Sequence, residues 1–340
     1  MSVAQAIKDL ARSIGFDRVG VAAATDADGF ERLTEWLARG FAGDMAYMHK
    51  HAPARRHPSS VLPGVRSVVM VSLNYRQTTS GGPIAQYARG LDYHDVLRDR
   101  LNRLLKAIQN VYPEIAGRGV VDTAPLLERD FARRAGLGWF GKNTMLIHPT
   151  LGSFFFLGAL LLDVDLPVDE PFAKNHCGTC TRCLDACPTD AFPAPGWLDS
   201  RRCISYLTIE QRGSIPDEFR SGLGNWAFGC DICQDVCPWN KKAPFAGDPA
   251  FAPREDLVAP DLLKLLEITE DEFRRQFRGT ALLRTKRVGL VRNVALVLGN
   301  LGDRAALPAL RRVSDDPDPI LREAAAWAIA KIAAANDAIR

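Results

Sequence analysis

The chain has 340 residues, of which 47% are hydrophobic and 24% are charged, the composition of a globular protein long enough for two or three domains. Its 43 basic and 40 acidic residues nearly balance, so any surface that binds nucleic acid must be local. All eight cysteines lie between Cys177 and Cys237, a clustering that is typical of metal ligation rather than of a secreted, disulfide-stabilised protein.

The N-terminus predicts a helix over 3–14, because Val3, Ile7 and Leu10 share one face, and it does not read as a signal peptide. The most apolar later stretch, 154–162, is too short to span a bilayer. We therefore expect a cytoplasmic protein without a membrane segment, in a compartment where free thiolates persist.

Residues 1–165 alternate helical and extended patterns, which predicts an α/β or α+β domain. Several extended segments are rich in valine, as buried strands tend to be. The expected helices are 3–14, 28–39, 95–110 and 125–135, and the expected strands are 18–23, 67–73, 119–122, 144–148 and 153–162.

Residues 166–250 contain every cysteine, many prolines and glycines and little periodicity, so metal rather than a large core must hold this part together. Within the last part, 251–340, the pattern is helical from Leu262 onward. Two related stretches, 288–303 and 318–333, predict HEAT-type helical repeats. A plain helical bundle is the alternative that so short a repeat leaves open.

The cysteine spacing matches the ferredoxin run CxxCxxCxxxCP at Cys177, followed by a second CxxCxxxCP run at Cys230. In such runs the last cysteine ligates the other cluster. This crossed rule assigns Cys177, Cys180, Cys183 and Cys237 to cluster one, and Cys187, Cys203, Cys230 and Cys233 to cluster two. Zinc is the alternative, but paired CxxC motifs would leave the second CxxxCP unexplained.

Residues 204–229 separate Cys203 from Cys230, where a compact ferredoxin would leave only two residues. Such an insertion beside a cluster could contact whatever the cluster reduces. The length of chain on either side indicates that the protein does more than carry electrons. No GxGxxG follows a strand, so a Rossmann nucleotide site is unsupported.

Seven stretches together carry a resemblance over nearly the whole chain. They are LPGVRSVVMVSLNY (62–75), YARGLDYHDVLRDRL (87–101), VDTAPLLERDFARRAGLGWFGKNTMLI (121–147), CGTCTRCLDACPTDAF (177–192), RRCISYLTIEQRG (201–213), FGCDICQDVCPWN (228–240) and RGTALLRTKRVGLVRNVALVLGNLGD (278–303). The chain resembles the epoxyqueuosine reductases, the iron–sulfur and cobalamin-dependent enzymes of queuosine synthesis in tRNA.

The resemblance implies an α+β protein with three parts. These are a cobalamin-binding catalytic domain over 1–165, a double [4Fe–4S] domain over 166–250 and a HEAT-like, tRNA-binding helical domain over 251–340. It also implies reduction of epoxyqueuosine to queuosine at the wobble position of tRNA anticodons. Electrons from a low-potential donor would pass through two clusters to cobalamin.

In the family's VD(S/T)xP motif an aspartate looks like the proton donor, and the matching residue is Asp122. An acid that donates near pH 7 needs a raised pKa, so we expect Asp122 to be partly buried against the corrin. On the pattern alone, an N-cap for the 125–135 helix is the simpler interpretation. The residues expected to contact cobalamin are Tyr93, His94, Asp122, Ser205 and Asp231.

Between Arg274 and Arg292 there are seven basic residues and no acidic one, a density that the near-neutral total conceals. Such a segment can neutralise phosphates, although a solvated helix face is the alternative. Trp226 or Phe228 could stack on a splayed base or pack in the core. The residues expected to contact tRNA are Arg284, Lys286, Arg287 and Arg292.

Two other functions remain open from the sequence: a reductive dehalogenase-like reductase of a small molecule, and an electron-transfer or scaffold protein. Reductive dehalogenases share the cobalamin-plus-ferredoxin plan but usually carry a twin-arginine export signal, which this sequence lacks. No long heptad or pairing strand favours an oligomer, so we expect a monomer.

Overall fold

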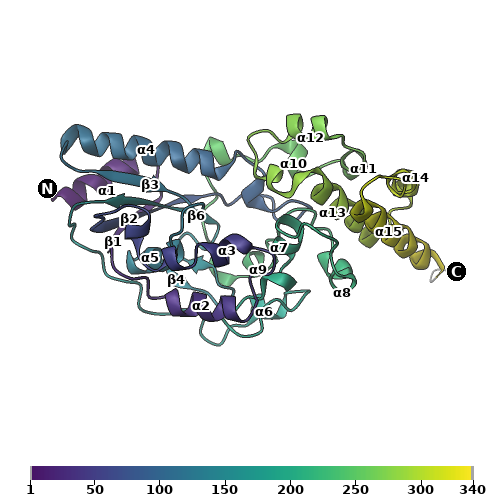
Figure 1. Cartoon of the computed structure of the whole chain (residues 1–340), viewed down its shortest axis with the longest axis horizontal. Coiled ribbons are helices and arrows are strands. Elements are labelled where there is room, and N and C mark those ends of the chain that lie inside the picture. The colour runs from purple at the N-terminus through teal and green to yellow at the C-terminus, as the bar shows by residue number, and fades with distance from the viewer. Residues whose placement is uncertain (1, 338–340) are drawn as a thin grey trace.

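A computed structural model describes residues 2–337 (Figure 1). The N-terminal half is built on a four-stranded sheet in the order β1–β2–β6–β3, and every neighbouring pair is antiparallel. The strands are β1 (Arg18–Ala23), β2 (Ser67–Asn74), β3 (Gly117–Val120) and β6 (Phe155–Leu162).

Helices cover both faces of this sheet. Helices α1 (Val3–Ser13) and α4 (Tyr93–Val111) lie on one face and α5 (Glu128–Arg134) on the other, so that β2 is buried along its whole length. The apolar side of α4 consists of Leu97, Leu101, Leu104 and Ile108, spaced as one helical face.

A glycine in β3, Gly119, determines how closely α4 packs on the sheet. A Cβ at Gly119 of β3 would lie 2.7 Å from the Cβ of Leu101 on α4, closer than real Cβ contacts allow. Glycine therefore lets the helix approach β3, and this approach brings the first turn of α4 beside the loop that follows β3.

Of the remaining helices and strands in residues 2–337, only α13 and α15 are long. These remaining elements are α2 (Phe30–Ala38), α3 (Ala46–Lys50), β4 (Trp139–Phe140), β5 (Leu146–Ile147), α6 (Arg182–Asp185), α7 (Ile204–Ile209), α8 (Asp217–Arg220), α9 (Ile232–Asp235), α10 (Glu255–Val258), α11 (Leu262–Leu266), α12 (Glu270–Gln276), α13 (Lys286–Leu301), α14 (Leu307–Val313) and α15 (Pro319–Asp337).

Helix α13 is the centre of the helical half, and its residues from Gly289 to Gly299 are buried, with α15 and α11 packed against the helix. The same core takes in the insertion 204–229 through Leu207, Phe219 and Phe228. The hydrophobic core thus continues across residue 250, so the domain limits expected there do not coincide with a break in packing.

The structure confirms the α+β fold class and most of the expected elements. Strand β3 lies two residues earlier than expected and α5 begins at Glu128 rather than at 125, while the β4–β5 hairpin starts before the expected 144–148 strand. In the described part of the chain, no helix is long and apolar enough to cross a membrane.

The shifts in β3 and α5 change the position of Asp122. It lies in the turn between them, and the N-cap position of α5 belongs to Leu127. The N-cap interpretation of Asp122 is therefore wrong, and its carboxylate is available for other contacts.

Candidate active site

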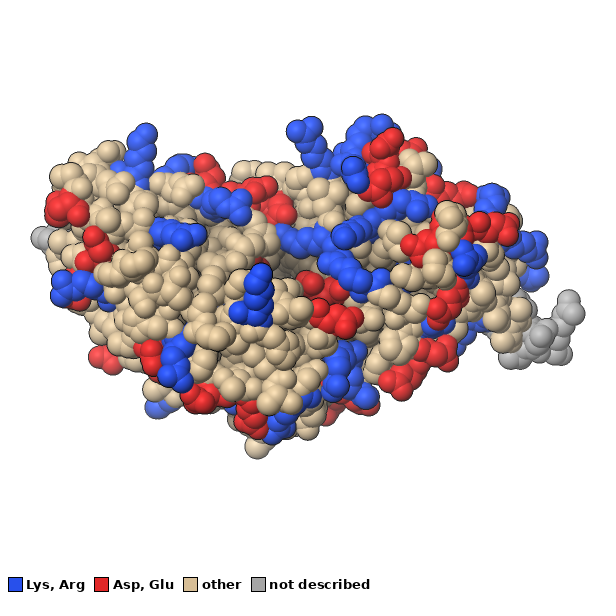
Figure 2. Space-filling model, viewed as in Figure 1, with Lys and Arg blue, Asp and Glu red and all other residues tan. Residues whose placement is uncertain are grey.

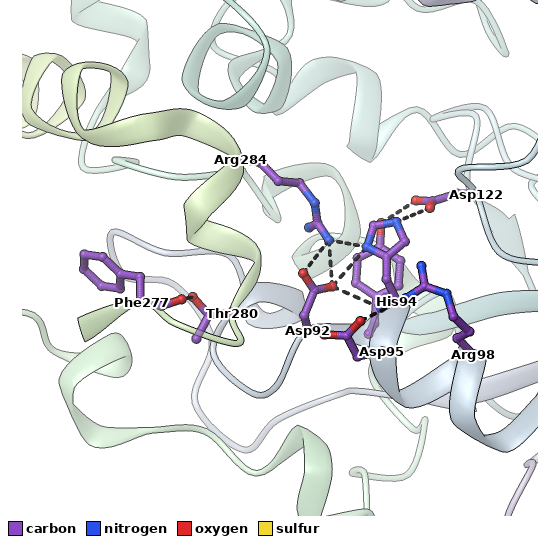
Figure 3. Close-up of polar contacts among 9 residues, drawn as sticks. Asp92, His94, Asp95, Arg98, Asp122, Phe277, Thr280 and Arg284 are labelled. Atoms are coloured by element: carbon purple, nitrogen blue, oxygen red, sulfur yellow. Dashed lines mark hydrogen bonds and ion pairs between the residues drawn. The ribbon is translucent and has the colours of Figure 1, made fainter. Parts of the chain in front are cut away.

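Three side chains meet at the edge of the sheet where α4 begins (Figure 3). The hydroxyl of Tyr93 donates to one carboxylate oxygen of Asp122, and Nε2 of His94 bonds to the other. Tyr93 and His94 come from the first turn of α4, and Asp122 comes from the loop after β3. The side chain of His94 is only 12% exposed, whereas that of Asp122 is 44% exposed. Asp122 therefore offers an accessible carboxylate that two buried groups orient.

A fourth residue, Asp92, contacts the other ring nitrogen of His94, Nδ1. As the N-cap of α4 it accepts a hydrogen bond of 3.0 Å from the His94 backbone N–H, and the same oxygen lies 3.0 Å from Nδ1 of the ring. Nη2 of Arg284, from the 3₁₀ helix Ala281–Thr285, donates to both oxygens of Asp92 at 2.7 and 2.8 Å. The result is a continuous chain of charged groups, Arg284–Asp92–His94–Asp122.

This chain determines where the resting proton lies. Burial lowers the pKa of His94, but the hydrogen bonds to Asp122 and Asp92 outweigh burial and raise it to about 9. Burial by itself raises the pKa values of both aspartates, yet the bonds from His94 reverse that effect. The pKa of Asp92 falls to about 2 and that of Asp122 falls below its ordinary value.

The expected raised pKa of Asp122 is therefore wrong for the ligand-free protein. The reason is that its neighbours are a cation and a hydroxyl donor, both of which stabilise the carboxylate anion. At neutral pH the proton lies on His94, one hydrogen bond away from Asp122.

The ring of Tyr93 is fixed on both of its faces. It stacks on the His94 ring at 4.2 Å between centroids and on Phe156 of β6 at 4.4 Å and 7°. The guanidinium of Arg284 lies 5.1 Å from the Tyr93 centroid. Tyr93 is thus a rigid platform that holds its hydroxyl against Asp122.

Ser205 and Asp231, the other residues expected to contact cobalamin, lie against protein groups. The Ser205 hydroxyl bonds to the thiol of Cys203 and lowers its pKa against the larger effect of burial. Asp231 is 1% exposed and accepts a 2.7 Å hydrogen bond from the Gln86 backbone N–H. Asp231 is thus buried and held by the backbone of the chain, and its contact with a corrin stays a prediction.

None of the eight cysteines forms a disulfide. Their electrostatic neighbours fall into two sets. Burial raises the pKa of Cys183 to about 11, with smaller contributions from the neighbouring thiols of Cys237, Cys177 and Cys180. Burial and then Cys203 and Cys187 raise the pKa of Cys230. Cys233 has Cys230, Cys203 and also Cys183 as neighbours, so the two sets adjoin.

Backbone N–H groups surround several of these sulfurs. The backbone N–H of Ile232 lowers the thiol pKa of Cys230, and the backbone N–H of Trp239 lowers that of Cys237. In both cases burial has the larger effect and raises the pKa. N–H donors directed at sulfur are the usual surroundings of thiolates that ligate iron–sulfur clusters. The donor set thus fits two four-thiolate clusters that share the module.

Two buried polar atoms near Asp122 have no hydrogen-bond partner among residues 2–337: Nε of Arg55 and Oε1 of Glu128. Burial shifts both pKa values, lowering that of Arg55 and raising that of Glu128, and Asp122 also acts on both. A buried polar atom without a partner costs about 1–3 kcal/mol. Both atoms would be satisfied by amide groups such as those at the rim of a corrin, so these residues fit a bound cobalamin.

The four basic residues that were expected to contact tRNA differ in exposure and in their partners within the protein. Arg292 is 1% exposed and donates to the Leu207 and Gln211 carbonyls, each at 2.8 Å, while burial lowers its pKa to about 10. Arg284 belongs to the charged chain described above. Arg292 is therefore corrected to an internal role, whereas Arg284 is paired with Asp92 and stays 27% exposed.

Arg287 is also engaged within the protein, because it donates to the Ile268 carbonyl at 2.6 Å and lies 3.5 Å from Asp316. Lys286 is exposed. Trp226 and Phe228 are 4% and 0% exposed in the core, so they pack rather than stack on a base.

Asp92 is the site residue that the sequence analysis missed. A signal was present, because aspartate is a favoured N-cap and Asp92 lies three residues before the helix expected at 95–110, which in the structure begins at Tyr93. Its contact with Arg284 could not be found, since the two residues are far apart in the chain and pair only through the tertiary fold.

Comparison with known proteins gives three matching family descriptions. Residues 55–123 match "Epoxyqueuosine reductase QueG, DUF1730", residues 176–240 match a 4Fe-4S double cluster binding domain, and residues 280–340 match HEAT repeats. The epoxyqueuosine reductase of Xanthomonas campestris pv. campestris is 43% identical over 337 residues, covering 96% of this chain and 95% of that protein. The chain belongs to the epoxyqueuosine reductase family.

Other members of the family agree over the same length. The Escherichia coli K12 epoxyqueuosine reductase is 40% identical, covering 97% of this chain and 89% of that protein. A crystal structure of an epoxyqueuosine reductase with an epoxyqueuosine-modified tRNA-Tyr stem loop superposes with a TM-score of 0.90 at 35% identity. It covers 97% of this chain and 91% of that one. The match over 176–240 supports two [4Fe–4S] clusters in this epoxyqueuosine reductase, and the match over 280–340 confirms the expected helical repeat.

The His94–Asp122 pair predicts a measurable titration. In NMR spectra of the imidazole nitrogens, the His94 signal should titrate near pH 9 in the wild-type protein. In Asp122→Asn it should titrate at lower pH, because the amide removes the charge that most favours the imidazolium. A His94→Gln sample assigns the signal, and an unchanged midpoint in Asp122→Asn would contradict the pairing.

Proposed function

We propose that this protein reduces epoxyqueuosine to queuosine in tRNA, with two [4Fe–4S] clusters, cobalamin and Asp122 as its working parts. The observation that carries the proposal is the accessible Asp122 carboxylate held by protonated His94, in a chain of this family. A relative of the same fold has been solved with an epoxyqueuosine-modified tRNA stem loop, which supports the same substrate here.

The reaction removes the epoxide oxygen as water and consumes two electrons and two protons. Cobalamin, when bound and reduced, would supply the electron-rich centre that the opening of the epoxide needs. Glu128 and Arg55 would hold the amide rim of the corrin through their unpartnered buried atoms. Asp122 acts electrostatically on both side chains, so they lie near it. A corrin held by them would therefore lie near the acid.

The oxygen that leaves carbon needs a proton, and we assign its delivery to Asp122. The proton moves along the existing hydrogen bond from Nε2 of His94 to the carboxylate, and from there to the oxygen. Tyr93 keeps the second carboxylate oxygen in place, so that the acid faces the substrate in one orientation. The Bacillus subtilis epoxyqueuosine reductase is described with an aspartate-bearing catalytic loop, which supports a catalytic role for an aspartate on the corresponding loop.

For the clusters we propose the crossed ligand sets. Cluster one is held by Cys177, Cys180, Cys183 and Cys237, and cluster two by Cys187, Cys203, Cys230 and Cys233. The thiol neighbours of Cys183 and Cys230 support these sets. The closeness of Cys233 to Cys183 supports direct electron transfer between the two clusters.

The crossed assignment can be tested by counting iron in double variants. Cys177→Ser together with Cys237→Ser removes two ligands of one cluster, so it should lose about half of the iron and sulfide. Cys177→Ser together with Cys230→Ser removes one ligand of each cluster and should lose nearly all. Equal iron content in the two double variants, measured after anaerobic reconstitution, would refute the crossed sets.

The proton donor can be tested with Asp122→Asn, which keeps the shape of the side chain but cannot donate a carboxyl proton. We expect full iron content and normal cobalamin absorbance, with turnover reduced about 10²- to 10⁴-fold, the usual contribution of general acid catalysis. Single turnovers of the pre-reduced protein with epoxyqueuosine tRNA measure this step apart from electron delivery. Wild-type turnover in the variant would exclude Asp122 as the donor.

For tRNA binding we propose the exposed basic side chains around the start of α13. Arg275, Arg278 and Lys286 are exposed, and none of the three has an ion-pair partner among the described residues. Figure 2 shows Lys and Arg side chains in a band across the junction between the sheet and the helical half. Because the candidate acid lies at the same junction, phosphates bound there would present an anticodon loop to it.

A charge-reversal pair tests this surface. Arg278→Glu with Lys286→Glu should weaken tRNA binding and lower the salt slope by about one for each phosphate that the protein no longer neutralises. Arg103→Glu with Lys106→Glu, an equal change of charge on the exposed side of α4, serves as the control. Equally weakened binding in both variants would point to a general charge effect and not to this surface.

A further inference from the structure

We propose that Arg284 is a positioning residue of the reduction. Through Asp92 it holds the His94 ring so that the Nε2 proton faces Asp122. The inference rests on the proposed role of Asp122 and adds to it a residue from the helical half of the protein, outside the part of the chain that supplies the acid.

The first support is the convergence of hydrogen bonds on Asp92. Its two carboxylate oxygens accept from Arg284 at 2.7 and 2.8 Å, while one of them also receives the His94 backbone N–H and lies beside the ring Nδ1. The backbone N–H of Asp92 donates to the Gly279 carbonyl at 2.8 Å, from the same segment as Arg284. Asp92 is therefore held from two sides by residues 279–284.

The second support is the fixed position of Arg284 itself. Arg212, from the insertion after α7, donates to the Arg284 carbonyl at 2.8 Å, and the Thr285 hydroxyl donates to the Thr208 carbonyl at 3.0 Å. The preceding turn is closed by the Thr280 hydroxyl on the Phe277 carbonyl at 2.8 Å. The guanidinium is thus presented by a backbone that is anchored on both sides.

The third support is the geometry at Nδ1 of His94. Nη2 of Arg284 contacts this nitrogen as well as Asp92. When the ring is an imidazolium, Nδ1–H donates to Asp92. Once Nε2 has given its proton to Asp122, the neutral ring keeps its hydrogen on Nδ1, which still donates to Asp92. Asp92, held by Arg284, thus keeps Nε2 directed at Asp122 in both protonation states.

The charge of Arg284 has a second effect on the same proton. The groups facing His94 are Asp92 and Tyr93 on α4, Asp122 on the loop after β3, Glu128 on α5 and Arg284. Both bonded carboxylates raise the pKa of His94, and Arg284 lowers it. By neutralising Asp92, Arg284 makes the imidazolium a better proton source for Asp122 than two unbalanced carboxylates would allow.

The test compares Arg284→Met with Asp92→Asn and with a control, Arg100→Met. Arg100 pairs with Asp248 at 2.5 Å, and their side chains are 16% and 15% exposed, so it is a partly buried Arg–Asp pair on α4 that does not touch the site. All proteins carry their clusters and cobalamin. The readouts are the His94 titration by NMR and single turnover with epoxyqueuosine tRNA across pH.

We expect Arg284→Met to raise the His94 titration midpoint and to lower kcat about 10- to 100-fold with little change in KM, the scale of a misplaced catalytic group. Asp92→Asn should lower the midpoint, because one carboxylate is lost. Arg100→Met should match the wild type in both readouts. Arg284→Lys, which keeps the charge, should restore the midpoint and part of kcat.

Two results would overturn the inference. One is wild-type titration and turnover in Arg284→Met. The other is a midpoint that falls in Arg284→Met as it does in Asp92→Asn, because that is the result of merely loosening the site. If Asp122→Asn kept full turnover, the role of Asp122 would fail on its own, while the effect of Arg284 on the His94 midpoint would still be decided by NMR.

Discussion

The carboxylate of Asp92 connects the helix that carries Tyr93 and His94 to the helical half of the protein. As an N-cap it satisfies a free backbone N–H in the first turn of α4. The same group binds the His94 ring and the Arg284 guanidinium. The start of α4, the orientation of His94 and the placement of residues 279–284 therefore depend on one side chain. Loss of its charge would leave two partly buried cations, His94 and Arg284, facing each other.

The insertion 204–229 likewise connects two parts of the protein, the cysteine-containing segment and the helical repeat. Its apolar side chains enter the core around α13, and its backbone carbonyls accept from Arg292 and Asn293, both of which are buried on α13. Because buried charges and amides must be paired, this polar contact fixes the register of the insertion against the helix. The proposed cluster ligand Cys203 and the proposed tRNA surface at Lys286 thus belong to one packed unit.

The features that were predictable from sequence follow local rules. Cysteine spacing, helical periodicity in α1 and α4, and the valine-rich strands β1 and β2 depend on neighbours within a few residues. The two-residue shift of β3 arose because Gly117 and Gly119 conceal a strand whose position is set by pairing with β6. The basic segment was misread for a related reason. Charge density along the chain does not reveal that Arg292 faces inward, toward carbonyls supplied by the insertion.

The pKa of Asp122 shows why a side chain's role must be read together with its neighbours. An acid kept protonated by apolar burial would be buried and without donors, whereas Asp122 is accessible and accepts two hydrogen bonds. Under the proposed role, acid and proton store are separate groups, and the charged chain sums to zero with the proton on either His94 or Asp122. The transfer therefore creates no unbalanced charge in a partly buried site, where such a charge would be costly. After donation to the leaving oxygen the chain carries one extra negative charge. This charge favours uptake of a replacement proton through the exposed carboxylate, in keeping with a reaction that consumes two protons per turnover.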